Sequence, residues 1–201
     1  NDCYRSGTSQ CAFTSCSGNS CDIVCSADFY YFADPTDAGT YAGESWGAEL
    51  VILDQSGLSA TQTAPYVELL RLRALSADNL IDYGSLEVNS NTGSYNATTT
   101  FTNIGNDAID VLIEGSNLTD GLTSTIPASE QIFATSTFSY AACTYCTQLS
   151  TTTTAYELDL AKPTTTAPGI SDDVYWGLEV PFGVSANAHQ GQNIFYATGD
   201  N

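Results

Sequence analysis

Apolar residues recur at every second position in most of the patterned stretches of this chain. The alternation covers 46–52, 95–101, 109–113, 156–160 and 174–180. In the last stretch, for example, Val174, Trp176 and Leu178 fall on one face of an extended segment. A period of two is typical of half-buried strands in antiparallel sheets, and Thr, Val, Ile and aromatic residues favour strands. The sequence therefore predicts an all-β fold.

One stretch, 66–77, has a composition that also suits a helix, because Leu, Arg, Glu and Ala are good helix formers. Within it, however, Leu70, Leu72 and Ala74 alternate with Arg71 and Arg73. Predicted strands also surround the segment. We therefore expect an extended segment that links two parts of the chain.

Turn signals divide the chain into two regions, with a boundary near Ala64 and Pro65. We expect 1–66 to form a smaller, cysteine-rich N-terminal β region. The remainder, 67–201, is long enough for a complete β-sandwich of short strands. Within it, the turn residues at 103–106 are expected to join the strands 95–101 and 109–113.

Seven cysteines punctuate the sequence, and five of them lie in the first 25 residues. They are Cys3, Cys11, Cys16, Cys21, Cys25, Cys143 and Cys146. The N-terminal spacings of seven, four, four and three intervening residues do not match paired zinc ligands. The Cys-x-x-Cys pair has no thioredoxin-like context for a redox role. We therefore expect disulfides.

An odd number of cysteines leaves one thiol after three disulfides, which suggests an intermolecular bond or a free thiol. Cys143 and Cys146 could close a tight local loop or tie the N-terminal segment to the second domain, and the sequence does not choose. Disulfides persist in oxidising, extracytoplasmic compartments. The cysteines thus favour an extracellular protein.

The charge balance is strongly acidic, with four basic residues against 23 acidic ones and a net charge of −19. Such a chain is repelled by nucleic acid and by anionic lipid, so neither is an expected partner. No apolar run approaches the roughly 20 residues needed to span a bilayer, so membrane insertion is not expected either.

Four patterns in the second half of the chain belong together. They are 81–86 (IDYGSL), 102–111 (TNIGNDAIDV), 126–129 (IPAS) and 174–183 (VYWGLEVPFG). These residues resemble an immunoglobulin-like domain of exported surface proteins of archaea and candidate-phylum bacteria. The segment 21–57 is similar to the one that often precedes this domain, whereas 188–193 departs from its usual Gly-Thr-Tyr pattern. The resemblance implies an antiparallel immunoglobulin-like β-sandwich in a surface structure, but it implies no activity.

No catalytic residue is assigned, and we do not expect an enzyme. Gly43-Glu-Ser-Trp-Gly47 matches the Gly-x-Ser-x-Gly nucleophile pattern, with Ser45 as the serine and His189 downstream. That pattern requires a strand-to-helix turn. Here it runs into an alternating stretch, so we interpret it as a turn before a strand.

Carboxylates are abundant and could bind calcium through oxygen ligands, for example in the loops 34–37 or 172–173. The aspartates considered are Asp34, Asp37, Asp54, Asp107, Asp110, Asp120, Asp172 and Asp173. No loop has the spacing of a calcium-binding motif. A solvated acidic surface is the simpler interpretation, and no cofactor is assigned.

Two sequons, at Asn96 and Asn117, are candidate glycosylation sites. Among the aromatic residues, Trp46 and Trp176 lie on apolar faces and are expected in the core, whereas Tyr30 and Tyr175 are expected to be more exposed. Exposed aromatic residues of this kind could stack on sugars.

These features together predict a structural subunit of an extracellular cell-surface assembly, such as a filament, sheath or surface layer. Its partners would be copies of itself, joined by strand pairing and an intersubunit disulfide. Other surface proteins or glycans are further expected partners. The alternative function is an adhesin or carbohydrate-binding module.

Overall fold

The computed structural model describes residues 10–18, 20–166 and 169–200. These residues form an all-β protein with antiparallel sheets, as the alternation predicts. Helical structure among them is limited to short 3-10 turns at Gly39–Tyr41 (η2), Ala128–Glu130 (η3) and Tyr140–Ala142 (η4).

The chain divides into two compact units. Unit 1 comprises 1–71 with 164–166, and unit 2 comprises 72–163 with 167–201. This division falls between Arg71 and Leu72, five residues after the boundary at 66 placed from the sequence. Each unit is described separately below.

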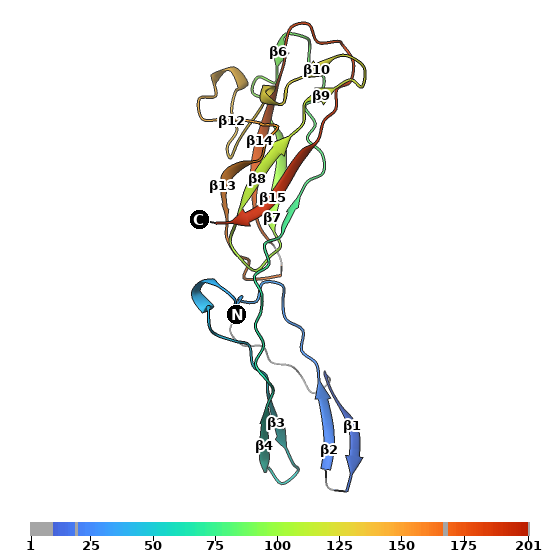
Figure 1. The fold of residues 1–201 in the computed structure, drawn as a ribbon, viewed down its shortest axis with the longest axis vertical. Helices are drawn as coiled ribbons and strands as arrows, with labels where there is room; N and C mark the ends of the chain where they lie inside the picture. Colours follow the sequence, from blue (N-terminus) through green and yellow to red (C-terminus); the bar gives the residue numbers. More distant parts are fainter. Residues whose placement is uncertain (1–9, 19, 167–168, 201) are drawn as a thin grey trace. The chain divides into compact units, whose positions relative to one another are not determined.

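A disulfide-bonded hairpin lies near the start of unit 1, formed by β1 (Cys11–Ser17) and β2 (Ser20–Cys25) (Figure 1). The Cys11–Cys25 and Cys16–Cys21 bonds join directly opposite residues near its two ends. The expectation of disulfides is therefore confirmed for these four cysteines, whereas Cys3 lies outside the described residues. Such covalent links hold two strands together without a buried core.

The strands of this hairpin carry unequal cysteine spacings, because the cysteines are five positions apart on β1 and four apart on β2. In a regular strand, residues an odd number of positions apart point to opposite faces, whereas residues an even number apart share a face. Two regular strands could therefore not place both cysteine pairs directly opposite each other. A bulge between Phe13 and Ser15 adds one residue, Thr14, to β1. This extra residue brings both cysteine pairs into register.

A second hairpin of unit 1 pairs β3 (Glu49–Leu53) with β4 (Ser59–Thr63) in regular antiparallel register. It coincides with the strand expected at 46–52, and Leu50 is half-buried as expected, but the three apolar residues that follow are exposed. Val51 is 52% exposed, Ile52 is 42% and Leu53 is 68%. These three side chains leave apolar surface open to solvent.

Unit 2 is a β-sandwich-like arrangement in which β8 and β15 pass in front of β7 and β14 (Figure 1). One sheet has the order β12-β11-β14-β7-β5, with β6 also paired to β14, and the other has the order β13-β8-β15. Strands β9 and β10 form a small separate ladder. The strands are β5 (Leu75–Ala77), β6 (Ser90–Asn91), β7 (Ala97–Asn103), β8 (Ile109–Gly115), β9 (Leu118–Thr119), β10 (Thr125–Ile126), β11 (Gln131–Ala134), β12 (Thr147–Gln148), β13 (Thr154–Leu160), β14 (Ile170–Val180) and β15 (Asn193–Gly199).

The main core lies between these two sheets and is aromatic. Trp176 on β14 is fully buried, with its ring centroid 4.9 Å from that of Phe133 on β11 and 6.1 Å from that of Phe195 on β15. Phe101 on β7 contacts Phe195 edge-to-face at 4.9 Å. The inward residues of β8, Ile109, Val111 and Ile113, complete the opposite side.

The turn at 103–106 connects the two sheets rather than closing a hairpin, because β7 and β8 do not pair with each other. Asn103 is fully buried there, and its side-chain Nδ2 donates to the carbonyl oxygens of Asp107, Leu160 and Ala161. Its Oδ1 accepts from the Gly105 N–H. One side chain therefore fixes the crossover through contacts far apart in the sequence.

We expect Asn103→Asp to destabilise unit 2 by about 1–3 kcal/mol, because aspartate has the same shape but cannot donate to the three buried carbonyls. Urea denaturation of the two proteins at neutral pH measures the difference. An unchanged transition midpoint would show that the crossover does not depend on this amide.

The link at 66–77 is extended and contains no helix, as the alternation indicates. Val67 forms an isolated bridge with Trp46, and only β5 at its end is a regular strand. The third disulfide, Cys143–Cys146, closes a tight loop before β12. This outcome selects the local loop from the two alternatives left open by the sequence.

Candidate functional site

Most sheet edges of unit 2 carry features that discourage pairing with another chain. The edge strands β12 and β5 have two and three residues. Strand β13 is interrupted between Tyr156 and Leu160, where it carries Glu157 and Asp159. Short length, bulges and charges are common ways of protecting an edge.

Strand β15 lacks all of these features. Its seven residues, Asn193–Gly199, pair with β8 in unbroken register and include no charged residue and no proline. None of the described residues pairs with its other side. A long, regular, uncharged edge is a template for a further strand.

Hydrogen-bond positions show which β15 groups face this open edge. Gln192 accepts from Ser116, and Asp200 donates to Ala108, so even-numbered residues form the hydrogen-bonded pairs with β8. In an antiparallel pair the intervening residues direct both N–H and C=O away from the partner. The backbone groups of Phe195 and Ala197 therefore point outwards.

The core is also incompletely covered next to this edge. Among the hydrophobic residues that are only partly buried against the main core are Leu75 and Ala77 of β5, and Phe195 and Ala197 of β15. These two strands contact each other along one side of the sandwich. A strand added to β15 would pair with its backbone and cover apolar surface at the same place.

The sequence did not predict β15, although its Ile-Phe-Tyr run, bounded by Gly191 and Gly199, has high strand propensity. The run is apolar on both faces, so it gives no alternation. The pairing with β8 decides which backbone groups of β15 point to the open edge. No local sequence pattern predicts that pairing.

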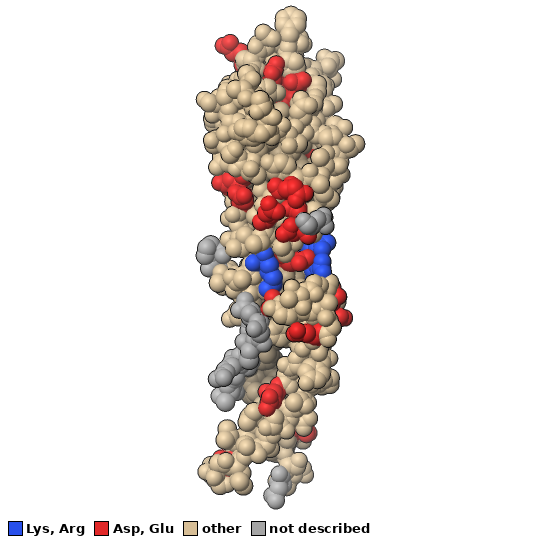
Figure 2. Space-filling view, turned by 90° about the vertical axis from the view of Figure 1, so that its left-hand side faces the viewer, with Lys and Arg blue, Asp and Glu red and all other residues tan. Residues whose placement is uncertain are grey.

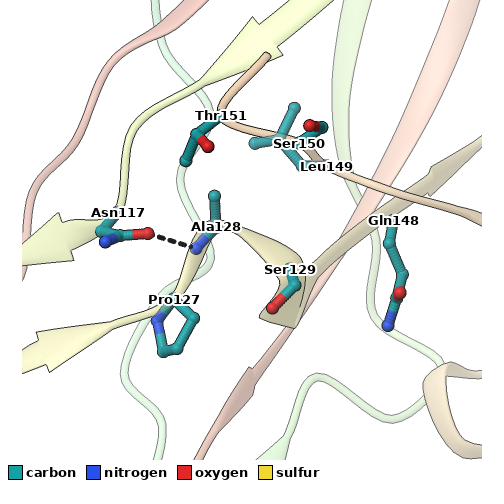
Figure 3. A pocket seen from close by; sticks show the side chains of 8 residues that line it. All are labelled: Asn117, Pro127, Ala128, Ser129, Gln148, Leu149, Ser150 and Thr151. Carbon is teal, nitrogen blue, oxygen red and sulfur yellow. Dashed lines mark hydrogen bonds between the residues drawn. The ribbon is translucent and has the colours of Figure 1, made fainter. Parts of the chain in front are cut away.

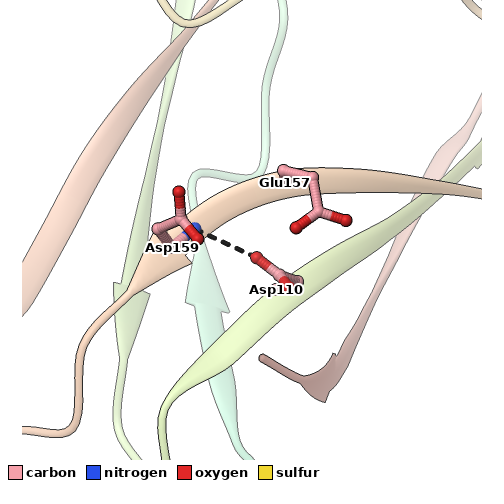
Figure 4. Close-up of side chains that lie close together, drawn as sticks. All are labelled: Asp110, Glu157 and Asp159. Atoms are coloured by element: carbon pink, nitrogen blue, oxygen red, sulfur yellow. Dashed lines mark hydrogen bonds between the residues drawn. The ribbon is translucent and has the colours of Figure 1, made fainter. Parts of the chain in front are cut away.

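A group of three carboxylates lies where β8 meets the irregular part of β13. One carboxylate oxygen from each of Asp110, Glu157 and Asp159 lies within 4.8 Å of the other two (Figure 4). Asp110 is only 2% exposed, and its Oδ1 accepts from the backbone N–H groups of Leu158 and Asp159 at 3.1 and 3.0 Å. The Asp110 carboxylate thus accepts two backbone N–H groups of β13 that the bulge removes from the β8–β13 ladder.

Of the eight aspartates considered from the sequence, Asp110 is the one in this group, and Glu157 and Asp159 were missed. The oxygen ligands suit a hard cation such as calcium, which stays an expectation. Without a cation, repulsion from Asp110 is the main cause that raises the pKa of Glu157 above its ordinary 4.5.

A raised pKa means that protonated Glu157 favours folding, and this contribution is lost as pH rises through the folded-state pKa. We therefore expect Glu157→Gln to raise the melting temperature at pH 7 and to leave it nearly unchanged at pH 4. Thermal denaturation at both values measures this. An equal effect at the two pH values would contradict the account, and calcium stabilising only the unsubstituted protein would show cation binding.

The other aspartates mostly hold nearby backbone. Asp54 accepts from the N–H groups of Ser56 and Leu58 in the β3–β4 turn, and Asp37 accepts from the Arg71 N–H. Asp107 forms a salt bridge with Arg73 at 2.9 Å. These contacts support structural roles for them.

A polar cluster joins the loop after β9 to the segment before β15. Hydrogen bonds from the Leu122 N–H and from the Asn187 and Ser185 side chains lower the pKa of Asp120. His189 lies 3.1 Å, Nε2 to Oγ, from Ser124. This serine was not a candidate from the sequence, and its contacts tie two loops together.

The remaining sequence candidates are dispersed. Ser45 is exposed in a turn that leads into β3 and not into a helix. Trp176 is in the core, as expected, whereas Trp46 is half-buried and donates through Nε1 to the Asp34 carbonyl. Tyr30 is 51% exposed.

Both sequon asparagines belong to unit 2. Asn96 immediately precedes β7, and Asn117 lies between β8 and β9. Each uses its amide oxygen to accept a backbone N–H, from Phe138 and Ala128 respectively. They differ in burial, because Asn117 is an exposed residue whereas the amide nitrogen of Asn96 is buried.

The fold and this edge define unit 2 as an antiparallel, sandwich-like domain with one open side. Comparisons of the chain with protein-family models, with curated proteins and with solved structures find no match. Within the described ranges, no helix has the length and apolar character to cross a membrane.

The strand order shares part of the immunoglobulin-like pattern. The order β5-β7-β14-β11 corresponds to strands A-B-E-D, and β8 pairs with β15 as C pairs with F. Two features depart from it: β13 pairs with β8 but follows β11 in the chain, and the G position beside β15 is not filled by any described strand. The family resemblance therefore stays a prediction.

Proposed function

We propose that this chain is a structural subunit of an extracellular cell-surface assembly, a filament, sheath or surface layer, that grows by strand pairing between copies. The observation that carries the proposal is the open edge of β15, which combines outward backbone groups with partly covered core. Backbone pairing supplies hydrogen bonds, and burial of the partly covered apolar residues of β5 and β15 adds a hydrophobic contribution.

The partner strand that we propose is β3 of a second copy. Four of its five residues are apolar, and Val51, Ile52 and Leu53 are 52%, 42% and 68% exposed. A two-stranded hairpin gains stability from a third strand. Each copy would then offer β3 to one neighbour and β15 to another, which is a head-to-tail contact that extends into a filament when the rotation between copies does not close a ring.

Hydrogen bonds again identify the outward groups of the hairpin. Asp54 donates to Leu58, and Ala64 donates to Ala48, so even-numbered residues form its hydrogen-bonded pairs. Val51 on β3 and the directly opposite Thr61 on β4 therefore direct their N–H groups to opposite outer edges. These two positions give a matched pair of substitutions.

We expect Val51→Pro to prevent assembly, because proline removes an outward donor of β3 without breaking the β3–β4 ladder. Thr61→Pro makes the same change on the other edge and should assemble normally. Static light scattering against protein concentration compares them. If only Thr61→Pro blocked assembly, β4 would be the pairing strand and the choice of β3 would be wrong.

Assembly should require cations, because the chain has a net charge of −19. Figure 2 shows acidic side chains spread over the face drawn, with basic ones confined to a few places. Like charges on neighbouring copies repel unless salt screens them, and screening acts over about 8 Å at physiological ionic strength. Negative-stain imaging in calcium and in salt-free buffer with chelator tests this. A monodisperse monomer at high concentration in both buffers would refute the proposed function.

A disulfide between copies is a further part of the proposal. The three bonds of the described residues use six of the seven cysteines, which leaves Cys3 by count. The disulfides are typical of an oxidising, extracellular or secreted setting. Non-reducing gel electrophoresis should show a dimer band that Cys3→Ser removes.

The second candidate function is an adhesin or carbohydrate-binding module. It is favoured by the exposed aromatic rings of unit 1, where Phe29 is 45%, Tyr30 51% and Tyr31 36% exposed. Aromatic faces can stack on sugars, and this function predicts a monomer. Glycan-array binding that Tyr30→Ala removes, together with failure to assemble, would favour it.

A further inference from the structure

We propose that Asn117 is a glycan acceptor of the folded protein and that Asn96, although it lies in an equally good sequon, is not. Both match Asn-x-Thr, as Asn96-Ala-Thr98 and Asn117-Leu-Thr119, so the sequence treats them alike. The structure distinguishes them by the environment of the atom that would carry the sugar, Nδ2.

Asn96 has no access for a glycan. Its Oδ1 accepts from the Phe138 backbone N–H at 3.0 Å, which fixes the amide orientation because only oxygen can accept there. The Nδ2 atom on the other side is buried and has no hydrogen-bond partner among the described residues. Attaching a sugar would require the side chain to leave its site and abandon the Phe138 contact.

Asn117 has the opposite geometry. The residue is exposed, and its Oδ1 accepts from the Ala128 N–H at 2.8 Å. Figure 3 shows the amide nitrogen turned away from Ala128, on the far side of this hydrogen bond. The amide is thus held in one orientation while its nitrogen stays accessible, and glycosylation would leave the Ala128 contact intact.

The accessibility of Asn117 follows from the exposure of the residue itself. A hollow of about 420 Å³ borders Asn117, and Ala128, Ser129, Gln148, Ser150 and Thr151 also line it. Because the amide nitrogen is turned away from Ala128, a sugar on Nδ2 would extend away from this hollow (Figure 3). The nitrogen of Asn96, by contrast, is buried.

The transfer itself needs an activated donor, which we take to be a sugar linked through pyrophosphate to a lipid. The Nδ2 atom attacks the anomeric carbon, a C–N bond forms, and the bond from that carbon to the pyrophosphate oxygen breaks. The pyrophosphate leaves with the electron pair, and the displaced amide proton passes to a base of the transferase. The acceptor must therefore present Nδ2 outside the protein surface.

Folded, disulfide-bonded protein incubated with an oligosaccharyl transferase and a lipid-linked donor tests the inference, with peptide mass spectrometry at both sequons. Thr119→Val and Thr98→Val remove one sequon each and leave both asparagines in place. We expect modification at Asn117 in the unsubstituted protein and in Thr98→Val, and none in Thr119→Val.

Reduced, denatured chain provides the control for folding, since both sequons should then be modified. Modification of Asn96 in the folded protein would overturn the inference. It would also be overturned if Asn117 stayed unmodified while a reference glycoprotein in the same reaction was modified. The readout is independent of self-association, so the proposed function can fail without affecting it.

Discussion

Replacing Ala197 by proline is expected to abolish assembly by strand pairing while leaving unit 2 folded. The Ala197 N–H points away from β8, so its loss removes a donor from the open edge and none from the existing ladder. Proline is tolerated at such edge positions, and the residue before it, Tyr196, already lies in an extended strand. Light scattering and negative-stain imaging in calcium should show no species larger than the disulfide-linked dimer.

Ala197→Val is the matched control, because valine keeps the N–H and suits a strand. It should assemble like the unsubstituted chain. Circular dichroism establishes that both variants are folded. If folded Ala197→Pro assembled normally, the β15 edge would not be the pairing surface.

Replacing Trp176 by alanine should destabilise unit 2 by about 3–5 kcal/mol, the typical cost of deleting a large buried aromatic side chain. Trp176 is fully buried on β14 and lies against rings from both sheets, Phe133 and Phe195. The cavity left by alanine would therefore lie at the centre of the sandwich. Because whole domains are stable by only about 5–15 kcal/mol, this change approaches the limit of folding.

Trp176→Phe separates the ring from its polar atom. The indole Nε1 is buried and has no hydrogen-bond partner among the described residues, so phenylalanine keeps most of the packing and removes an unsatisfied donor. We expect its cost to be much smaller than that of alanine in urea denaturation followed by circular dichroism. If both variants lost the same free energy of unfolding, the indole nitrogen, and not the packing of the ring, would account for the contribution of Trp176.

The alternation of apolar residues was sufficient to predict four strands of the sandwich. Strands β7, β8, β13 and β14 coincide with stretches in which every second residue is apolar, because each has a face on the core. The same signal at 46–52 also marked a strand, but not its environment. Alternation shows that one face of a strand can be buried, yet on the alternating face of β3 Leu50 is half-buried while Ile52 stays 42% exposed.

Features that depend on contacts between distant residues were not available from the sequence. Asn103 looked like a turn residue, yet its hydrogen bonds to Leu160 and Ala161 make the turn a crossover between sheets. Asp110 was expected on a solvated face but is buried against a bulge of β13. In both cases the partner lies about 50 residues away in the sequence, beyond the reach of local patterns.

The disulfides are a third case. The sequence predicted that the cysteines form disulfides, but only the structure shows which cysteines are joined. Spacing argued against a zinc site, but the connectivity required Thr14, the extra residue that aligns both bonds of the first hairpin. The open edge of β15 likewise could not be predicted, because the register with β8 decides which of its backbone groups point outwards.

The first hairpin is held together by two covalent bonds and buries almost nothing, whereas the sandwich relies on a packed interior. Thiol reductants and heat should therefore damage different parts of the same molecule. In a reducing compartment the chain would keep its sandwich and lose the hairpin, so correct maturation depends on oxidation reaching the first 25 residues.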